Sequence, residues 1–152
     1  MKATAICSLF LLSIFAFTSC KKEFPDDPFA LTDLLVNGCK TKGDNAKGAE
    51  QEYITLKTVD NYYLLFKHIN SIFNCVPGQI YVTADISSNK ITITEIETDP
   101  IANCVCPYDL EFKIGPIQYG TYSLIFTKAG LIFKEYSLDF KNSTDIQVDL
   151  DK

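Results

Sequence analysis

The sequence predicts an all-β protein folded as a single β-sandwich of about eight antiparallel strands. Three observations predict this fold. The chain has 152 residues, the length of one domain, and 47 % of them are hydrophobic, which is enough to bury a core. Short segments of alternating apolar and polar residues recur from residue 52 onward, with Gly, Pro, Asn and Asp turns between them. No segment shows a helical period over a useful length.

The N-terminal half of the domain contains two clear strand signals. Residues 53–58 alternate, and residues 62–69 form a second, more continuously apolar run. Residues 30–36 are a short apolar segment whose type the pattern does not determine. Residues 37–50 are polar and contain Gly, which is typical of a loop.

The next two strands are predicted to form a hairpin. Residues 79–86 and 90–97 both alternate, and only residues 87–89 separate them. A compact turn there places Ile86 opposite Ile91. The same alternation turns Ile91, Ile93 and Glu95 to one face.

Four further strands are predicted in the C-terminal half. They are residues 109–114, 121–127, 131–140 and 146–150, with a bulge near Lys134 where the alternation changes parity. Together the strands predict a sandwich of immunoglobulin-like or transthyretin-like type, with no internal repeat and no second domain.

Part of this half resembles prealbumin-like modules of secreted bacterial proteins. The residues that carry the resemblance are 120–124 (GTYSL), 129–130 (AG) and 146–148 (IQV). The resemblance covers about 35 residues and implies only a similar β module.

The first residues are predicted to be an export signal. Lys2 precedes an apolar run at residues 6–17, which is too short for a transmembrane helix and fits the core of a signal peptide. The run ends in FTSC, which resembles a bacterial lipobox, although Phe17 stands where that pattern prefers Leu. The resemblance implies a signal peptide at residues 1–19 and a lipidated Cys20. An ordinary secretory signal that happens to contain Cys20 is the alternative.

Residues 20–29 are then expected to be a lipidated tether, and residues 30–152 the single domain. Within the tether, residues 23–29 contain two prolines and three acidic residues, which is typical of an extended segment. Two or three acyl chains hold a domain on a bilayer far better than one. We therefore expect a protein anchored in the bacterial outer membrane, on its periplasmic or its cell-surface face.

The cysteines predict two disulfide bonds. Beyond the signal peptide and Cys20, four cysteines remain, and an even number in an exported chain allows three connectivities. A bond between Cys104 and Cys106 would close a strained ring. Extending the hairpin register places Cys75 opposite Ala102, one diagonal step from Cys104. We therefore expect Cys75–Cys104 and, for the remaining pair, Cys39–Cys106.

A metal centre is the rival interpretation of these cysteines. Four thiolates suit zinc or copper(I), and Cys104 and Cys106 form a soft-metal pair. The spacing matches no zinc-ribbon pattern, and His68 is the only imidazole in the chain. In an oxidising compartment we expect disulfides and no metal or other cofactor.

The cysteine region also resembles a group of small Bacteroidales lipoproteins. The matching residues are 73–75 (FNC), 91–95 (ITITE) and 104–110 (CVCPYDL). This resemblance implies a compartment and a host lineage but no activity.

Two further residues are candidates for a functional site. His68 lies in the apolar run 62–69, and we interpret it as a satisfied or half-exposed strand histidine rather than a ligand or base. Asp109 follows the CVCPY run at the expected start of a strand, where we expect its carboxylate to cap a turn.

The acidic residues offer only weak metal sites. Glu95, Glu97 and Asp99 are near one another but lack the oxygen-rich, Gly-containing loop of calcium sites. Asp26 and Asp27 fit a solvated tether better than a ligand pair.

The charge of the chain excludes one class of partner. It has 14 basic residues, all Lys, against 19 acidic ones, for a net charge of −5. A chain without Arg lacks the bidentate group that suits phosphates and bases, so we expect no nucleic-acid partner. With one His and no assembled catalytic motif, we expect no enzyme.

Two functions remain. The first is a non-catalytic binding, adhesion or assembly module that contacts a glycan or an envelope protein through a sheet face or its loops. The second is a redox or metal-handling lipoprotein that works through Cys104 and Cys106. Tyrosines offer an apolar face with a polar tip, so they are candidates to line a sugar or peptide surface: Tyr62, Tyr63, Tyr119, Tyr122 and Tyr136.

Replacing Cys20 by Ala tests the predicted anchor. We expect the Cys20→Ala protein to move from the membrane fraction to the soluble fraction, because it loses the lipidated residue. Fractionation and immunoblotting measure this, with Cys7→Ala as the control that stays on the membrane. A Cys20→Ala protein that still sediments with membranes would show that the lipobox assignment is wrong.

Overall fold

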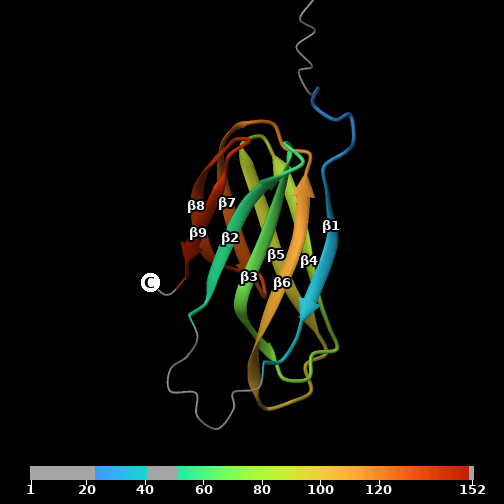
Figure 1. The fold of residues 1–152 in the computed structure, drawn as a ribbon. Coiled ribbons are helices and arrows are strands. Elements are labelled where there is room, and N and C mark those ends of the chain that lie inside the picture. The colour runs from blue at the N-terminus through green and yellow to red at the C-terminus, as the bar shows by residue number, and fades with distance from the viewer. Residues whose placement is uncertain (1–22, 41–50, 151–152) are drawn as a thin grey trace, which may run out of the picture.

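The computed structural model describes residues 23–40 and 51–150, and these residues form two packed β-sheets without any helix (Figure 1). The predicted all-β sandwich is confirmed. Cys20 lies outside the described residues. The strands are β1 Ala30–Asn37, β2 Tyr53–Val59, β3 Tyr63–Asn74, β4 Gln79–Ser87, β5 Lys90–Thr98, β6 Val105–Gly115, β7 Gly120–Lys128, β8 Leu131–Phe140 and β9 Asp145–Asp149.

The topology differs from the prediction in two details. One sheet has the order β1-β6-β3-β2-β9 and the other the order β4-β5-β7-β8. There are nine strands in the described ranges rather than about eight, and β5 and β7 pair in parallel rather than antiparallel. The parallel pair arises because β6 belongs to the opposite sheet. The chain therefore leaves the second sheet after β5 and re-enters it as β7 in the same direction.

The hairpin of β4 and β5 has the predicted register. Ile86 lies opposite Ile91, and the pairing continues without a shift to Gln79 opposite Thr98. This long, regular register is what carries Cys75 and Cys104, just beyond it, to the same end of the sandwich.

The segment of undetermined type before the first loop is an edge strand. β1 pairs with β6 in an antiparallel register that shifts between Thr32 and Leu35. The described part of the predicted tether, residues 23–29, precedes β1 and has no strand. It is not free of the domain, because the ring of Phe24 packs edge-on against Tyr62 at 5.1 Å and Phe29 packs against the core.

Two strands extend further than the pattern indicated. β3 and β6 both run on to the disulfide end of the sandwich, where Phe73 lies opposite Cys106. A bulge between His68 and Ser71 shifts the alternation of β3 by one residue. For this reason the alternation predicted a strand that ended at residue 69. In β8 the extra residue is Phe133, next to Lys134, where the bulge was expected.

The core lies between the two sheets and consists of the inward-facing residues of every central strand. Phe66 of β3 stacks on Phe112 of β6 at 4.4 Å and contacts Phe126 of the opposite sheet at 5.4 Å. The largest fully buried apolar side chains are Phe66, Phe73, Phe112, Phe126, Phe140, Ile54, Leu56, Leu64, Ile91, Ile93, Leu110 and Ile114. Burying a side chain of this size contributes about 1.5–3 kcal/mol relative to exposure.

Both predicted disulfides are present. Cys39 is bonded to Cys106, and Cys75 is bonded to Cys104. The amide of Cys75 also donates a hydrogen bond of 3.0 Å to the carbonyl of Cys104, which continues the strand-like pairing beyond β3.

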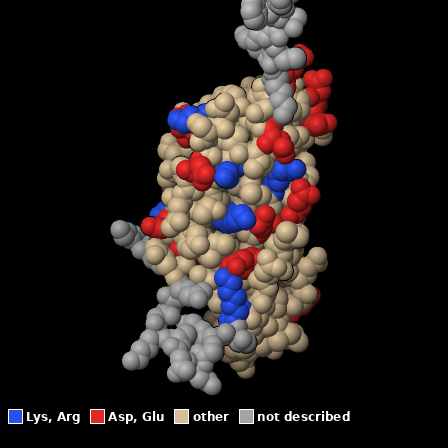
Figure 2. Space-filling model, viewed as in Figure 1, with Lys and Arg blue, Asp and Glu red and all other residues tan. Residues whose placement is uncertain are grey.

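The charged side chains are mixed in sign over the face shown in Figure 2, and few of them lie at its lower end. Across neighbouring strands, Lys67 pairs with Glu111 at 2.7 Å and Lys113 with Asp33 at 3.3 Å. Such half-exposed pairs each contribute about 0–1 kcal/mol. The described residues contain no helix that is long and apolar enough to cross a membrane.

Removing one disulfide at a time tests what these bonds contribute. We expect Cys75→Ser combined with Cys104→Ser to lower the free energy of unfolding by about 3 kcal/mol, because the bond restricts the unfolded chain. Urea denaturation measures the loss. The control is the native protein. Peptide mapping without reduction must first show that it contains both disulfide bonds. A double variant as stable as the native protein would contradict the expected contribution.

Candidate functional site

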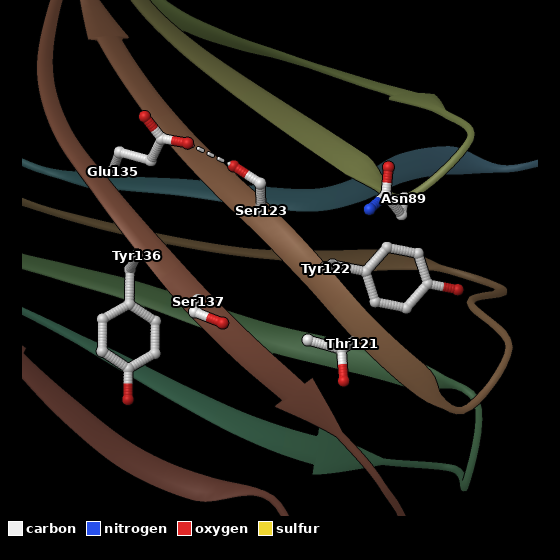
Figure 3. A pocket seen from close by; sticks show the side chains of 7 residues that line it. All are labelled: Asn89, Thr121, Tyr122, Ser123, Glu135, Tyr136 and Ser137. Atoms are coloured by element: carbon white, nitrogen blue, oxygen red, sulfur yellow. Dashed lines mark hydrogen bonds between the residues drawn. The ribbon is translucent and has the colours of Figure 1, made fainter.

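A polar hollow lies on the second sheet, where β7 and β8 run side by side next to the turn between β4 and β5 (Figure 3). Its volume is about 330 Å³. It is lined by Asn89, Thr121, Tyr122, Ser123, Glu135, Tyr136 and Ser137. This is near the lower limit for small-molecule sites, which span roughly 300–1,000 Å³.

The strand pairing explains why hydroxyl groups gather there. Ser123 of β7 lies opposite Ser137 of β8, and Thr121 lies two positions along on the same face. The carbonyl of Asn89 accepts a 2.8 Å hydrogen bond from the amide of Ser123, which holds the β4–β5 turn against β7. The hydroxyl of Ser123 donates a 2.6 Å hydrogen bond to Glu135, as the dashed line in Figure 3 shows.

Two tyrosines of the hollow occupy the intervening strand positions. Tyr122 and Tyr136 therefore turn their side chains to the opposite face from Ser123 and Ser137. The hydroxyl of Tyr122 donates a 2.9 Å hydrogen bond to the carbonyl of Gln118, and burial raises its pKa. The hollow thus offers hydroxyls, an amide and a carboxylate, and the tyrosine rings pack toward the core.

The other candidate tyrosines lie elsewhere. Tyr62 and Tyr119 contact each other at 5.2 Å, and Tyr119 continues to Phe140 at 5.6 Å. Tyr63 lies under the ammonium group of Lys113, 5.3 Å from its ring centre. The structure therefore does not bring the five tyrosines into one surface.

A second group of polar residues is buried between the sheets and centres on His68. This side chain is fully buried, and its Nδ1 lies 2.5 Å from a carboxylate oxygen of Glu95. Its Nε2 lies 2.9 Å from Glu52, at an angle that does not make a well-formed hydrogen bond. The ring of Phe133 stacks over the imidazole at 5.9 Å.

The same cluster continues to the opposite sheet. The ammonium group of Lys128 donates a 2.8 Å hydrogen bond to the hydroxyl of Ser71, and that hydroxyl donates one of 3.0 Å to Glu95. Lys128 also lies 3.9 Å from Glu95 and 3.7 Å above the ring of Phe73. Burial lowers the pKa of Lys128, and the charges of nearby glutamates oppose that change.

Opposed effects also act on the pKa of His68. Burial is the largest single effect and lowers this pKa. The hydrogen bond to Glu95 and the nearby carboxylate of Glu52 together outweigh burial and raise the pKa above 6.5. The two carboxylates therefore favour the protonated form of the imidazole. Because His68 is fully buried, its position suits a structural ion pair better than contact with a substrate.

The structure corrects the sequence interpretation of His68. The imidazole is fully buried rather than half-exposed, and it is Nδ1, not Nε2, that has a hydrogen-bond partner. Glu95 is also buried, at 1 % exposed, and its carboxylate points inward to His68. The signal was present in the alternation, which turned Glu95 to the same face as Ile91 and Ile93.

Asp109 does not cap a turn. It lies within β6, where it pairs with Lys40 at 2.6 Å and accepts a 3.1 Å hydrogen bond from the amide of Asn70. The prediction failed because β6 begins at Val105, four residues earlier than the alternation indicated.

The described residues offer one group of potential metal ligands, the sulfur atoms of Cys39, Cys75 and Cys106, which lie within 4.8 Å of one another. All three are in disulfide bonds. Cys104 and Cys106 belong to different bonds, so they do not form a pair of their own. Glu97 accepts a 2.9 Å hydrogen bond from the amide of Asn74, while Glu95 points inward to His68.

No family model, curated protein or solved structure matches this chain. The role of the protein has to be inferred from its own residues and their arrangement.

The raised pKa of His68 predicts a stability that depends on pH. A folded-state pKa above that of the unfolded chain gives stability that is complete below pH 6.5 and is lost as pH rises through the folded-state value. We expect the free energy of unfolding to fall over this range in the native protein but not in His68→Gln. Urea denaturation at a series of pH values measures both, and equal pH profiles would contradict the prediction.

The carboxylate partner gives an independent measure of the same cluster. We expect Glu95→Gln to lower the free energy of unfolding by about 3–5 kcal/mol, because it leaves the buried His68 and the partly buried Lys128 without their shared charge partner. The control is Glu111→Gln, which breaks a half-exposed pair with Lys67 and should cost less than about 1 kcal/mol. Similar losses in the two variants would show that the buried cluster is not a stabilising unit.

Proposed function

We propose that this protein is a lipid-anchored recognition module of the bacterial outer membrane, and that the polar hollow between β7 and β8 binds a glycan. The observation that carries the proposal is the composition of the hollow, where Ser123, Ser137 and Thr121 lie beside Glu135 and Asn89 in a volume of about 330 Å³. These groups supply both donors and acceptors.

Hydroxyl and carboxylate groups of this kind match a polyol better than an apolar or strongly charged ligand. The single carboxylate, Glu135, accepts from Ser123 and keeps acceptor capacity for a ligand hydroxyl. A charge-assisted hydrogen bond is about twice as strong as a neutral one, so Glu135 is the residue most able to discriminate among ligands. No cationic side chain lines the hollow, so an anionic ligand would lack a partner there.

The anchor is supported by the lipobox-like ending at Cys20, and the tether by the composition of residues 23–29. A rigid domain on a short tether suits recognition or assembly at the envelope. The absence of an assembled catalytic group in the sequence supports binding without turnover.

A screen of soluble residues 24–152 against glycans tests this function. We expect binding without turnover, and we expect Glu135→Gln to weaken it about tenfold or more, because a charge-assisted hydrogen bond contributes about 1.5–3 kcal/mol. Glycan arrays followed by calorimetry measure the affinity.

The matched control is Asp85→Asn, which neutralises an exposed carboxylate on β4, the opposite edge of the same sheet. We expect this variant to bind as the native protein does. Binding that is equally sensitive to both variants would place the ligand elsewhere. Turnover of a ligand, lost in His68→Ala, would contradict a non-catalytic role.

A further inference from the structure

A lysine, an asparagine and an aspartate meet at the disulfide end of the first sheet. The ammonium nitrogen of Lys40 lies 2.8 Å from the side-chain carbonyl oxygen of Asn70 and 2.6 Å from a carboxylate oxygen of Asp109. The backbone amide of Asn70 donates a 3.1 Å hydrogen bond to that same carboxylate oxygen. The three groups therefore share one site, and neither the hollow nor the buried His68 cluster uses them.

The fold holds each of these side chains in place. Asn70 is 5 % exposed and lies in the β3 bulge with a φ of 60°, so its side chain departs from the regular alternation of the strand. Its side-chain amide donates a 3.0 Å hydrogen bond to the carbonyl of Gln51, which turns its oxygen toward Lys40. Asp109 projects from the neighbouring strand β6.

Lys40 is positioned by covalent and backbone contacts. It follows Cys39, whose disulfide to Cys106 ties the end of β1 to the start of β6. Its amide donates a 3.0 Å hydrogen bond to the carbonyl of Pro107. The Lys40 and Asp109 side chains are 36 % and 25 % exposed, so water reaches the pair only in part.

We propose that Lys40 and Asn70 form an intramolecular isopeptide bond, with Asp109 carrying the proton. An amine held against a carboxamide in this way is placed for attack on the carbonyl carbon, because orientation removes much of the entropic barrier of the reaction. A carboxylate next to both groups is the proton acceptor and donor that the exchange requires.

The reaction balances without any further reagent. Lys40 first gives one proton to Asp109, which makes its nitrogen a nucleophile. A bond then forms between the Lys40 nitrogen and the side-chain carbonyl carbon of Asn70, while the bond from that carbon to the Asn70 nitrogen breaks. The departing nitrogen takes a second proton from the attacking nitrogen and leaves as ammonia. Asp109 returns its proton to the ammonia and is restored, and no group is oxidised or reduced.

The product would link the end of β1 to β3 across β6, since the sheet order is β1-β6-β3. It would lie beside the Cys39–Cys106 disulfide but would resist reducing agents. This modification is independent of the glycan-binding proposal.

Peptide mapping tests the bond. The full chain is purified from membranes, incubated overnight at neutral pH, reduced, alkylated and digested with trypsin. We expect residues 23–42 to be recovered joined to residues 68–90, with a mass lower than the sum of the two peptides by one ammonia, and with no cleavage after Lys40.

Three variants separate this chemistry from simple packing. Lys40→Arg keeps a cation beside Asp109 but has no amine that can attack, so the joined peptide should disappear. Asp109→Asn keeps the side-chain size but cannot carry the proton, so the joined fraction should fall at least tenfold. Lys67→Arg is the control, since Lys67 pairs with Glu111 on the same two strands, and it should keep the bond.

The outcomes decide the proposal. Recovery of residues 23–40 and 68–90 as separate peptides from the native protein, with Asn70 unmodified, would overturn it. A joined peptide that persists in Lys40→Arg would show that other residues form the bond.

Discussion

The interaction on which the rest of this structure depends is the ion pair between His68 and Glu95 in the middle of the sandwich. The imidazole is fully buried on β3 and the carboxylate is 1 % exposed on β5, so each needs the other as a polar partner away from water. Because β3 and β5 belong to different sheets, this contact fixes how one sheet lies on the other. Removing either partner leaves a buried charge uncompensated, which is far more costly than the pair itself is stabilising.

The same pair constrains the register of the strands around it. Ile91, Ile93 and Glu95 share the inward face of β5, and a slip of one residue would turn all three outward and leave His68 without its partner. The parallel pairing of β5 with β7 places Lys128 directly beside Glu95, and Ser71 then connects the two by hydrogen bonds. A slip of two residues would keep the apolar side chains inward but would still separate Glu95 from His68, so we infer that this polar cluster selects one arrangement of the sheets.

Local patterns in the sequence were sufficient for most of the strands and for the hairpin register. The register continues without a shift from the Ile86–Ile91 pair toward Cys75 and Cys104. Because of this regularity, the pairing of these two cysteines could be predicted. Alternation describes only one strand at a time, however, so it could not show that β6 joins the other sheet or that β5 and β7 are therefore parallel. The partners of His68 and the hollow beside Asn89 both depend on that crossover. An acidic residue on an otherwise apolar strand face was the one available signal, and it required a buried partner that the sequence alone did not identify.

These constraints bear on how the proposed hollow would bind. Its Ser123 is held at the backbone by Asn89 and at the hydroxyl by Glu135, so the polar groups are oriented before any ligand arrives. The strands that carry them are fixed from inside by the His68 cluster through Lys128 of β7, and the far end of the sandwich is closed by two disulfides. A site that is already ordered loses little conformational entropy on binding, so a small contact area can still give useful affinity. For a hollow of about 330 Å³, affinity for a glycan would therefore depend more on this prior ordering than on the area buried.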